Sequence, residues 1–341
     1  MMKAAMFNGP GIVTLNQYDI PEPEPGWVRL AIQSVGICGS DLHLLAAHNF
    51  PNEGMRPGHE IAGVIDCIGD DVTLATGTHV TVEPLIGCGG CFSCSTGHIN
   101  RCRDFSIFGL HKPGAMAEYI NVPASLLYEV PCAIDPAVVA LTEPMAVVVR
   151  GLRMGGSGLG SRIAILGAGS LGLLTIIAAR NAGVDEIHVS ARYPHQAALA
   201  TALGASSVHQ NGQILLDTVG PDRIDTVYET VGGASNTLIE AGKLARPGGK
   251  IVVLGTFEGN SALPMFEFSL KELTMHGSVC YAHDQSASDF AIARDLVVAN
   301  ASALSQLITH RYSLDQVAEA FATAADKRSG AIKIQIQPSN N

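Results

Sequence analysis

The sequence predicts an α/β protein built on a doubly wound parallel sheet, and two observations carry this prediction. Residues 163–179 read IAILGAGSLGLLTIIAA, in which a short apolar run ends at a G-x-G-x-x-G pattern and an uncharged helical run follows. The later apolar runs 186–190, 224–230 and 250–255 read as strands separated by helical segments. Strands that alternate with helices are typical of a parallel sheet with helices on both faces.

The glycines of this pattern predict a turn that binds a dinucleotide. Gly167 permits a tight turn, Gly169 lets the backbone approach a diphosphate, and Gly172 lets the helix pack closely on the strand. Ser170 and Leu171 stand at the start of the helix, where free N–H groups favour an anion. The alternative is a glycine-rich turn in some other α/β protein, because the pattern alone is a weak signal.

Length and composition predict a globular protein with two domains. The chain has 341 residues, 47% of them hydrophobic, and a formal net charge of -10. The negative charge and the lack of a basic run disfavour nucleic acid as a partner. The most apolar long run is too short and glycine-rich for a membrane span, and the N-terminus lacks the pattern of a secretion signal. We therefore expect a cytoplasmic protein that is not attached to a membrane.

The N-terminal part contains a candidate catalytic metal site. Residues 3–35 read as a β-rich opening that is interrupted by a proline cluster at 21–26. After it, Cys38, His59 and Glu60 supply a thiolate, an imidazole and a carboxylate, a ligand set that suits zinc. Three protein ligands leave one position open for water or substrate, as a catalytic zinc requires. Each of the three residues alone is more often structural, Cys38 as a small buried residue and His59 as a capped core histidine.

A cluster of cysteines predicts a second, structural metal site. Its members follow the spacing C-x2-C-x2-C-x7-C and are Cys88, Cys91, Cys94 and Cys102. Four thiolates so close in sequence can surround one zinc ion tetrahedrally and leave no open position. Two disulfides and an iron–sulfur cluster are the alternatives. The other cysteines, Cys67, Cys132 and Cys280, read as ordinary buried residues.

Together these motifs resemble those of the zinc-dependent medium-chain alcohol dehydrogenases, in the branch that contains sorbitol, butanediol, threonine and sugar-alcohol dehydrogenases. The resemblance covers essentially the whole chain and rests on GICGSDLH, GHE, the four cysteines, GAMAEYI, LTEPMAV and LGAGSLG. It implies a GroES-like β-rich catalytic domain over 1–148 with a zinc lobe at 86–104, a Rossmann domain over 149–280, and a return to the catalytic domain over 281–341. It also implies a homo-oligomer, a tetramer or a dimer, formed through an exposed edge of the Rossmann sheet.

The resemblance also assigns catalytic roles. It implies that the thiolate, imidazole and carboxylate named above ligate the catalytic zinc. Glu143 matches a further glutamate that reaches this zinc directly or through water, although a glutamate before proline could simply begin a helix. Ser40 and His43 match a relay that passes the alcohol proton to solvent. Such a relay is needed because zinc lowers the pKa of the alcohol, and the proton that the alcohol loses must be carried away. His43 as a mere surface histidine is the alternative.

The end of the second Rossmann strand bears on the choice of cofactor. In NAD-binding domains an acidic residue there accepts hydrogen bonds from the ribose 2′-OH. In this chain that position is Ala191, and Arg192 follows it. A carboxylate would repel a 2′-phosphate, whereas Ser190 can donate a hydrogen bond to it and Arg192 can pair with it. The sequence therefore predicts NADP(H) over NAD(H), with a solvated arginine and relaxed cofactor choice as the alternative.

The substrate is only partly constrained. The family counterpart of residues 107–120 brings Phe108 and His111 near the substrate cleft, although a loop histidine is more often solvated. Sorbitol-type members carry an arginine where this chain has Cys280, which disfavours sorbitol itself. Threonine dehydrogenases carry a histidine just before the four-cysteine lobe, and TVEPLIGC contains none, which disfavours threonine.

The sequence thus predicts a zinc-dependent, NADP(H)-preferring enzyme that interconverts a small secondary alcohol, polyol or sugar-derived, and its ketone. The alternatives are an NAD-dependent short-chain diol or alcohol dehydrogenase and a non-catalytic dinucleotide-binding module, which would not need the zinc residues. At the C-terminus we expect a connecting turn at 309–313, a helix over 313–326 and a strand over 331–337.

Overall fold

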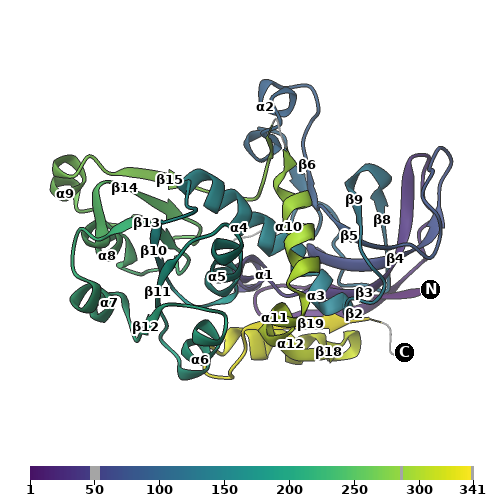
Figure 1. Cartoon of the computed structure of the whole chain (residues 1–341). Helices are drawn as coiled ribbons and strands as arrows, with labels where there is room; N and C mark the ends of the chain where they lie inside the picture. The colour runs from purple at the N-terminus through teal and green to yellow at the C-terminus, as the bar shows by residue number, and fades with distance from the viewer. Residues whose placement is uncertain (47–53, 285–286, 339–341) are drawn as a thin grey trace. The chain divides into compact units, whose positions relative to one another are not determined.

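The computed structural model describes residues 1–46, 54–284 and 287–338 (Figure 1). The chain divides into two compact units, one of residues 1–143 and 282–341 and the other of residues 144–281. None of the helices in the described ranges combines the length and apolar character that a membrane span needs.

A seven-stranded sheet forms the centre of the first unit. Its order is β18-β19-β3-β4-β5-β9, and β8 also pairs with β3. Buried residues alternate along β3 as expected for a strand with one face on the core, which includes Leu30, Ile32 and Phe321. The strands of this sheet are β3 (Trp27–Gly36), β4 (Glu60–Ile68), β5 (His79–Val82), β8 (Tyr119–Pro123), β9 (Leu127–Glu129), β18 (Ile308–Ser313) and β19 (Lys333–Gln337).

Smaller elements complete the first unit. Its two-stranded pairs are β1 (Met2–Phe7) with β2 (Val13–Tyr18), β6 (Leu85–Ile86) with β7 (Ser106–Ile107), and β16 (His283–Asp284) with β17 (Ala287–Ser288). Its helices are α1 (Gly39–Ala46), α2 (Phe92–Ser95), α3 (Pro136–Val139), α10 (Asp289–Ala299), α11 (Ala301–Leu304) and α12 (Val317–Ala325). Single 3-10 turns are η1 (Ile99–Arg101), η2 (Ala124–Leu126), η3 (Ser305–Leu307) and η4 (Leu314–Gln316).

Two expectations for the first unit were wrong. The segment expected as a turn at 309–313 belongs to strand β18, which pairs in parallel with β19. The β-branched and aromatic residues of β18 favour a strand, and β18 pairs along the edge of β19 that no other strand of the described residues occupies. Cys132, expected to be buried, is exposed, and Cys67 is only half-buried. Cys132 lies in the turn between β9 and α3, so no regular element carries it into the core.

The second unit confirms the predicted parallel sheet. Its six strands run in the order β12-β11-β10-β13-β14-β15, and every neighbouring pair is parallel. The strands are β10 (Arg162–Leu166), β11 (Glu186–Ser190), β12 (Ser207–His209), β13 (Ile224–Glu229), β14 (Ala245–Val253) and β15 (Thr274–Gly277). Strand order reverses between β10 and β13, and ligands of open α/β sheets bind at such a switch point.

Helices accompany the sheet of the second unit, and burial of one of them explains an apolar stretch of the sequence. They are α4 (Thr142–Gly155), which begins at the end of the first unit, α5 (Ser170–Asn181), α6 (Pro194–Ala202), α7 (Gly212–Val219), α8 (Thr237–Leu244) and α9 (Met265–Leu270). In α5 the residues from Gly172 to Ala179 are all buried, which explains why the helix after the glycine pattern carries no charge there. Cys280, also expected to be buried, is half-buried and has a positive φ of 51°.

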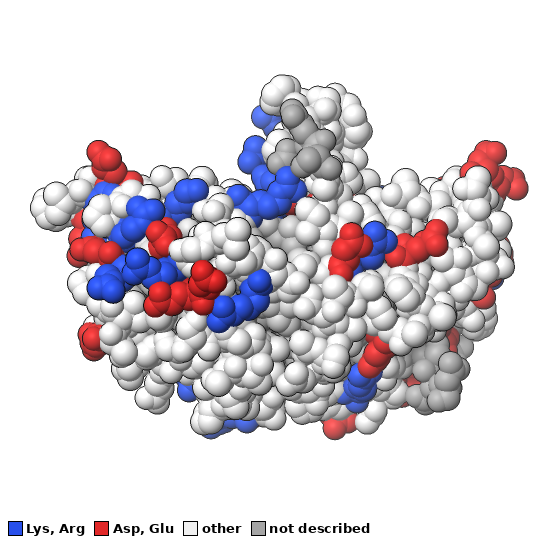
Figure 2. Space-filling view, in the orientation of Figure 1, with Lys and Arg blue, Asp and Glu red and all other residues white. Residues whose placement is uncertain are grey.

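Figure 2 shows one face of the molecule, on which acidic and basic side chains are interspersed and separated by wide uncharged areas. The uncharged areas reflect a chain in which only 15% of the residues are charged.

Candidate functional site

The three predicted ligands of a catalytic metal lie together in the first unit. Cys38 stands between β3 and α1, His59 directly precedes β4, and Glu60 is its first residue. One ligand atom from each lies within 4.8 Å of the others. Donor atoms that bind one zinc ion at about 2.0–2.3 Å lie close to one another, so donors gathered this closely could bind a single ion. The sulfur, nitrogen and oxygen donors also match the preferences of zinc.

A buried aspartate supports this cluster. Asp41 is fully buried, its Oδ2 accepts a hydrogen bond from the Cys38 N–H at 2.9 Å, and its Oδ1 lies 3.7 Å from Nδ1 of His59. Burial raises the pKa of Asp41. Burial would lower the pKa of His59, but the charges of Asp41 and Cys38 raise it well above its ordinary value. A carboxylate behind Nδ1 is a common device that directs Nε2 of a histidine toward a metal.

Lys333 is the main residue of this site that the sequence analysis missed. Its Nζ donates to both carboxylate oxygens of Glu60, at 2.7 and 2.9 Å, and to the carbonyl of Ile37 at 3.2 Å. Lys333 and Glu60 are 3% and 0% exposed, so this ion pair is shielded from water. Burial would lower the pKa of Lys333, but the charge of Glu60 raises it. No signal in the sequence connects these two residues, which are 273 positions apart.

Sheet geometry explains how Lys333 and Glu60 meet. The strands that carry them, β19 and β4, lie on the two sides of β3. Gly36 is the residue of β3 that pairs with Glu60. A Cβ at Gly36 would lie 1.9 Å from Oε2 of Glu60, so only glycine leaves room for the carboxylate here. The ion pair therefore depends on the strand order and on one glycine.

The other predicted catalytic residues lie around this cluster. Ser40 is near His59, with 3.4 Å between its Oγ and Nε2 of the histidine. His43 is exposed and stands three residues further along α1, a spacing that places both side chains on one face of the helix. Glu143 is buried in the first turn of α4, and burial raises its pKa to about 7. Glu143 is not in the group whose ligand atoms lie within 4.8 Å, so direct ligation by it stays a prediction.

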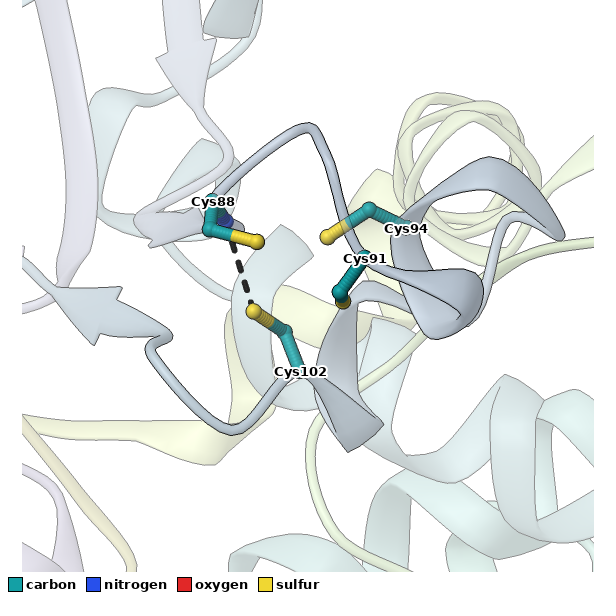
Figure 3. Close-up of side chains that lie close together, drawn as sticks. All are labelled: Cys88, Cys91, Cys94 and Cys102. Atoms are coloured by element: carbon teal, nitrogen blue, oxygen red, sulfur yellow. Dashed lines mark hydrogen bonds between the residues drawn. The ribbon is translucent and has the colours of Figure 1, made fainter.

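The four clustered cysteines also converge. Figure 3 shows their thiol groups turned toward one another, and their sulfur atoms all lie within 4.8 Å. The Cys88 N–H donates to the sulfur of Cys102 at 3.3 Å. A hydrogen bond from the Cys94 backbone lowers the pKa of Cys91, whereas burial raises the pKa of Cys94, so Cys91 is the thiol of this pair that ionises first. All four cysteines are free, and their arrangement fits a closed structural zinc site.

Replacing Cys102 by serine is expected to remove this second zinc. Because structural sites need all four ligands, the zinc content should fall by about one ion per chain and the unfolding temperature should fall with it. Elemental analysis and thermal unfolding measure both effects. Cys132→Ser is the matched control, because Cys132 is exposed and lies outside both clusters. An unchanged zinc content in Cys102→Ser would contradict the assignment.

The glycine pattern lies at the switch point of the second unit. Gly167 follows β10 with a φ of 103°, and Gly169 caps α5, whose first two residues are Ser170 and Leu171. A Cβ at Gly172 would lie 2.0 Å from the carbonyl oxygen of Gly167, so the helix passes the turn at a distance that excludes a side chain. The free N–H groups of this helix start are suited to a diphosphate.

The predicted cofactor-selecting residues lie at the end of β11. Ser190 is buried, and its Oγ accepts a hydrogen bond from the Gly167 N–H at 3.1 Å, so it also supports the glycine turn. Ala191 is 3% exposed, and its N–H donates to the His209 carbonyl at 2.7 Å. Arg192 is exposed. This edge therefore has alanine at the position where NAD-binding domains place a carboxylate, and an exposed arginine follows it.

The two predicted substrate residues differ in exposure. Phe108 is 3% exposed and belongs to the core of the first unit. His111 is exposed, its Nδ1 accepts a hydrogen bond from the Ile107 N–H at 3.2 Å, and its ring meets Phe105 edge-on. With Nδ1 as acceptor, the neutral ring carries its proton on Nε2. A substrate role for either residue stays a prediction.

Comparison with known proteins gives matches along nearly the whole chain. Residues 24–132 match the alcohol dehydrogenase GroES-like domain, and residues 170–298 match the zinc-binding dehydrogenase family. The chain is 30% identical to the sorbitol dehydrogenase of Arabidopsis thaliana over 351 residues, which cover 97% of this chain and 94% of that protein.

Solved structures also resemble this chain over nearly its whole length. A zinc-binding dehydrogenase from Sinorhizobium meliloti 1021, bound to NADP, has a TM-score of 0.90 and 32% identity, with 99% of each chain covered. A short chain alcohol dehydrogenase from Escherichia coli CFT073, complexed with NADH, has a TM-score of 0.89 and 26% identity, with 98% of this chain and 99% of that chain covered.

Proposed function

Since the chain belongs to the zinc-dependent medium-chain alcohol dehydrogenases and is an oxidoreductase of that family, we propose that it interconverts a secondary alcohol and its ketone with NADP(H). The proposed substrate is a polyol or a sugar-derived alcohol. The observation that carries the proposal is the cluster of Cys38, His59 and Glu60, whose ligand atoms lie within 4.8 Å of one another and could hold a metal ion. Three protein ligands would leave one position of a tetrahedral zinc for water or substrate. A purely dinucleotide-binding protein would have no use for such a set.

The residues around the cluster support catalysis by proton removal and charge stabilisation. Zinc bound there would supply a Lewis acid that lowers the pKa of the alcohol. Ser40 and His43 would take up the alcohol proton and pass it to solvent. Lys333 holds Glu60 by hydrogen bonds to both carboxylate oxygens, and Asp41 places a buried carboxylate 3.7 Å from Nδ1 of His59. A bound nicotinamide would supply the hydride chemistry.

The preference for NADP(H) is the finer part of the proposal. Solved relatives carry either NADP or NADH, so the preference rests on the residues of this chain. Ala191 supplies no carboxylate that would bond a ribose 2′-OH or repel a 2′-phosphate, and the exposed Arg192 can pair with the phosphate.

The test is an assay of the purified protein with its zinc content measured. NADP and NAD are supplied separately with a panel of polyols, diols and sugar-derived alcohols. Turnover with a secondary alcohol that is faster with NADP supports the proposal. Preference for NAD would contradict the cofactor assignment and favour the diol dehydrogenase alternative. Absence of turnover with either cofactor, at full zinc content, would favour a binding module.

Replacing Arg192 by alanine is expected to lower kcat/KM for NADP by about 10–100-fold and to leave kcat/KM for NAD nearly unchanged. The reason is the loss of a charged hydrogen bond to the 2′-phosphate. Steady-state kinetics with each cofactor measure the effect. Arg328→Ala is the matched control, because Arg328 is an exposed arginine in the first unit. Equal losses with both cofactors would argue against the assigned role.

We also propose a cytoplasmic homo-oligomer, a tetramer or a dimer. In the described part of the second unit, β15 has a neighbouring strand on one side only. Its open edge would allow the sheet to continue into a second copy. Light scattering during size-exclusion chromatography measures the number of subunits.

A further inference from the structure

We propose that Glu229 is a positioning residue for the bound dinucleotide, a role that rests on the proposed function. Glu229 is the last residue of β13, the neighbour of β10 across the switch point. Dinucleotides bind in the crevice outside the carboxyl ends of strands at this point. The glycine turn follows the end of β10, and the loop of residues 230–236 follows Glu229 at the end of β13, so the two segments leave neighbouring parallel strands at the same edge of the sheet.

The carboxylate of Glu229 organises this loop, residues 230–236. Glu229 is fully buried, and its Oε1 accepts hydrogen bonds from the N–H groups of Val231 at 2.8 Å and Gly232 at 3.0 Å. It also accepts from the hydroxyl of Thr237 at 2.9 Å, and Thr237 is the first residue of α8. One oxygen atom therefore holds both ends of the loop. Hydrogen bonds to a carboxylate in a buried place are stronger than those to a neutral acceptor.

Other bonds connect the loop to the neighbouring strands. The Thr230 hydroxyl donates to the carbonyls of Leu166 at 2.9 Å and Gly167 at 3.1 Å, where the glycine turn begins. On the other side, the Gly233 N–H donates to the Thr256 carbonyl at 2.7 Å. A shift of the loop would therefore move the carbonyls that shape the diphosphate turn.

Val231 is a second side chain of this loop, besides Thr230, that lies beside the glycine turn. It is 45% exposed although it is apolar, and a Cβ placed on Gly167 would lie 2.7 Å from its Cγ2. An exposed apolar side chain in a ligand crevice is a typical packing surface for a nucleotide. Glu229 itself is buried and would act on the cofactor through Val231 and Thr230 without contacting it.

The experiment compares Glu229→Ala and Glu229→Gln with the wild type in their zinc-loaded forms. NADPH is titrated against each protein, its fluorescence is followed, and zinc is counted. Glu229→Ala is expected to raise the Kd for NADPH about tenfold, as loss of a buried charged acceptor would. Glu229→Gln retains an acceptor oxygen and is expected to stay within about threefold of the wild type. In both variants zinc content should not change, and KM for the cofactor should change more than kcat.

Thr237→Val keeps the proposal testable if Glu229→Ala does not fold. It removes one of the three donors and is expected to raise the Kd for NADPH about threefold. The matched control is Thr218→Val, because the exposed Thr218 hydroxyl bonds only within α7, to the carbonyl of Ile214, among the described contacts. This control should bind NADPH as the wild type does.

The outcomes separate this proposal from the proposed function. Unchanged NADPH affinity in Glu229→Ala or, where that variant does not fold, in Thr237→Val would overturn the positioning role and leave the proposed function standing. A Thr237→Val variant that melts earlier but binds NADPH normally would mean that the network is merely structural. A wild-type protein that binds neither NADPH nor NADH would overturn both.

Discussion

A Cys38→Ala variant is expected to lose one zinc ion per chain and at least about a thousandfold in turnover. The thiolate is one of three ligands that hold the catalytic metal in the proposed site, and Lewis-acid stabilisation of the reacting oxygen is worth several kcal/mol. Elemental analysis and steady-state kinetics with a secondary alcohol measure the two effects. NADPH binding, followed by fluorescence, should be retained, because the glycine turn belongs to the second unit.

Cys67→Ala is the control for this variant. Cys67 is a half-buried free cysteine that lies outside both ligand clusters, so its removal should change neither zinc content nor turnover. A Cys38→Ala enzyme that retains both zinc ions, or that turns over at the wild-type rate with one, would contradict the catalytic assignment of the cluster.

A Lys333→Met variant is expected to lose about 3–5 kcal/mol of unfolding free energy. The substitution leaves the carboxylate of Glu60 buried without its counter-charge, and an uncompensated buried charge is strongly destabilising. Zinc bound next to Glu60 would offset part of this cost, so the loss should be larger in protein treated with a chelator. Urea denaturation with and without chelator measures the difference.

Two further variants identify the cause of that loss. In Glu60→Gln/Lys333→Met the buried charge is gone, so the double variant should be more stable than Lys333→Met alone. Lys3→Met removes a lysine at the surface, with 40% of its side chain exposed, that pairs with Asp315 at 2.8 Å, and the substitution should have little measurable effect. If Lys3→Met and Lys333→Met were equally stable, the ion pair between Lys333 and Glu60 would not contribute to the stability of the fold.

Local patterns were enough to predict the fold class and the family. The glycine pattern, the strand before it and the helix after it are adjacent in sequence, so their geometry follows from short-range rules. The four clustered cysteines fall within 15 residues, so their convergence also depends mainly on local chain geometry. The regular alternation of later strands and helices indicated the parallel sheet that the structure contains.

Contacts across the sheets were beyond such rules. Thr309–Ser313 was expected as a turn because its strand character appears only when β19 offers an open edge. Asp41 stood within a quoted motif, yet nothing in the sequence alone showed that its carboxylate faces His59. The role of Glu229 depends on a loop that folds back over the end of its own strand.

By itself, the sequence determined the class of sheet, the family, and the residue types available to bind zinc and a dinucleotide. Only the tertiary structure decided which of those residues are held in place, and by what. Lys333 meets Glu60 because β19 and β4 both lie beside β3 and because Gly36 leaves room between them. The energy of such an ion pair depends on how deeply it is buried and on the distance between its two charged groups. Neither quantity can be derived from the spacing of the residues along the chain.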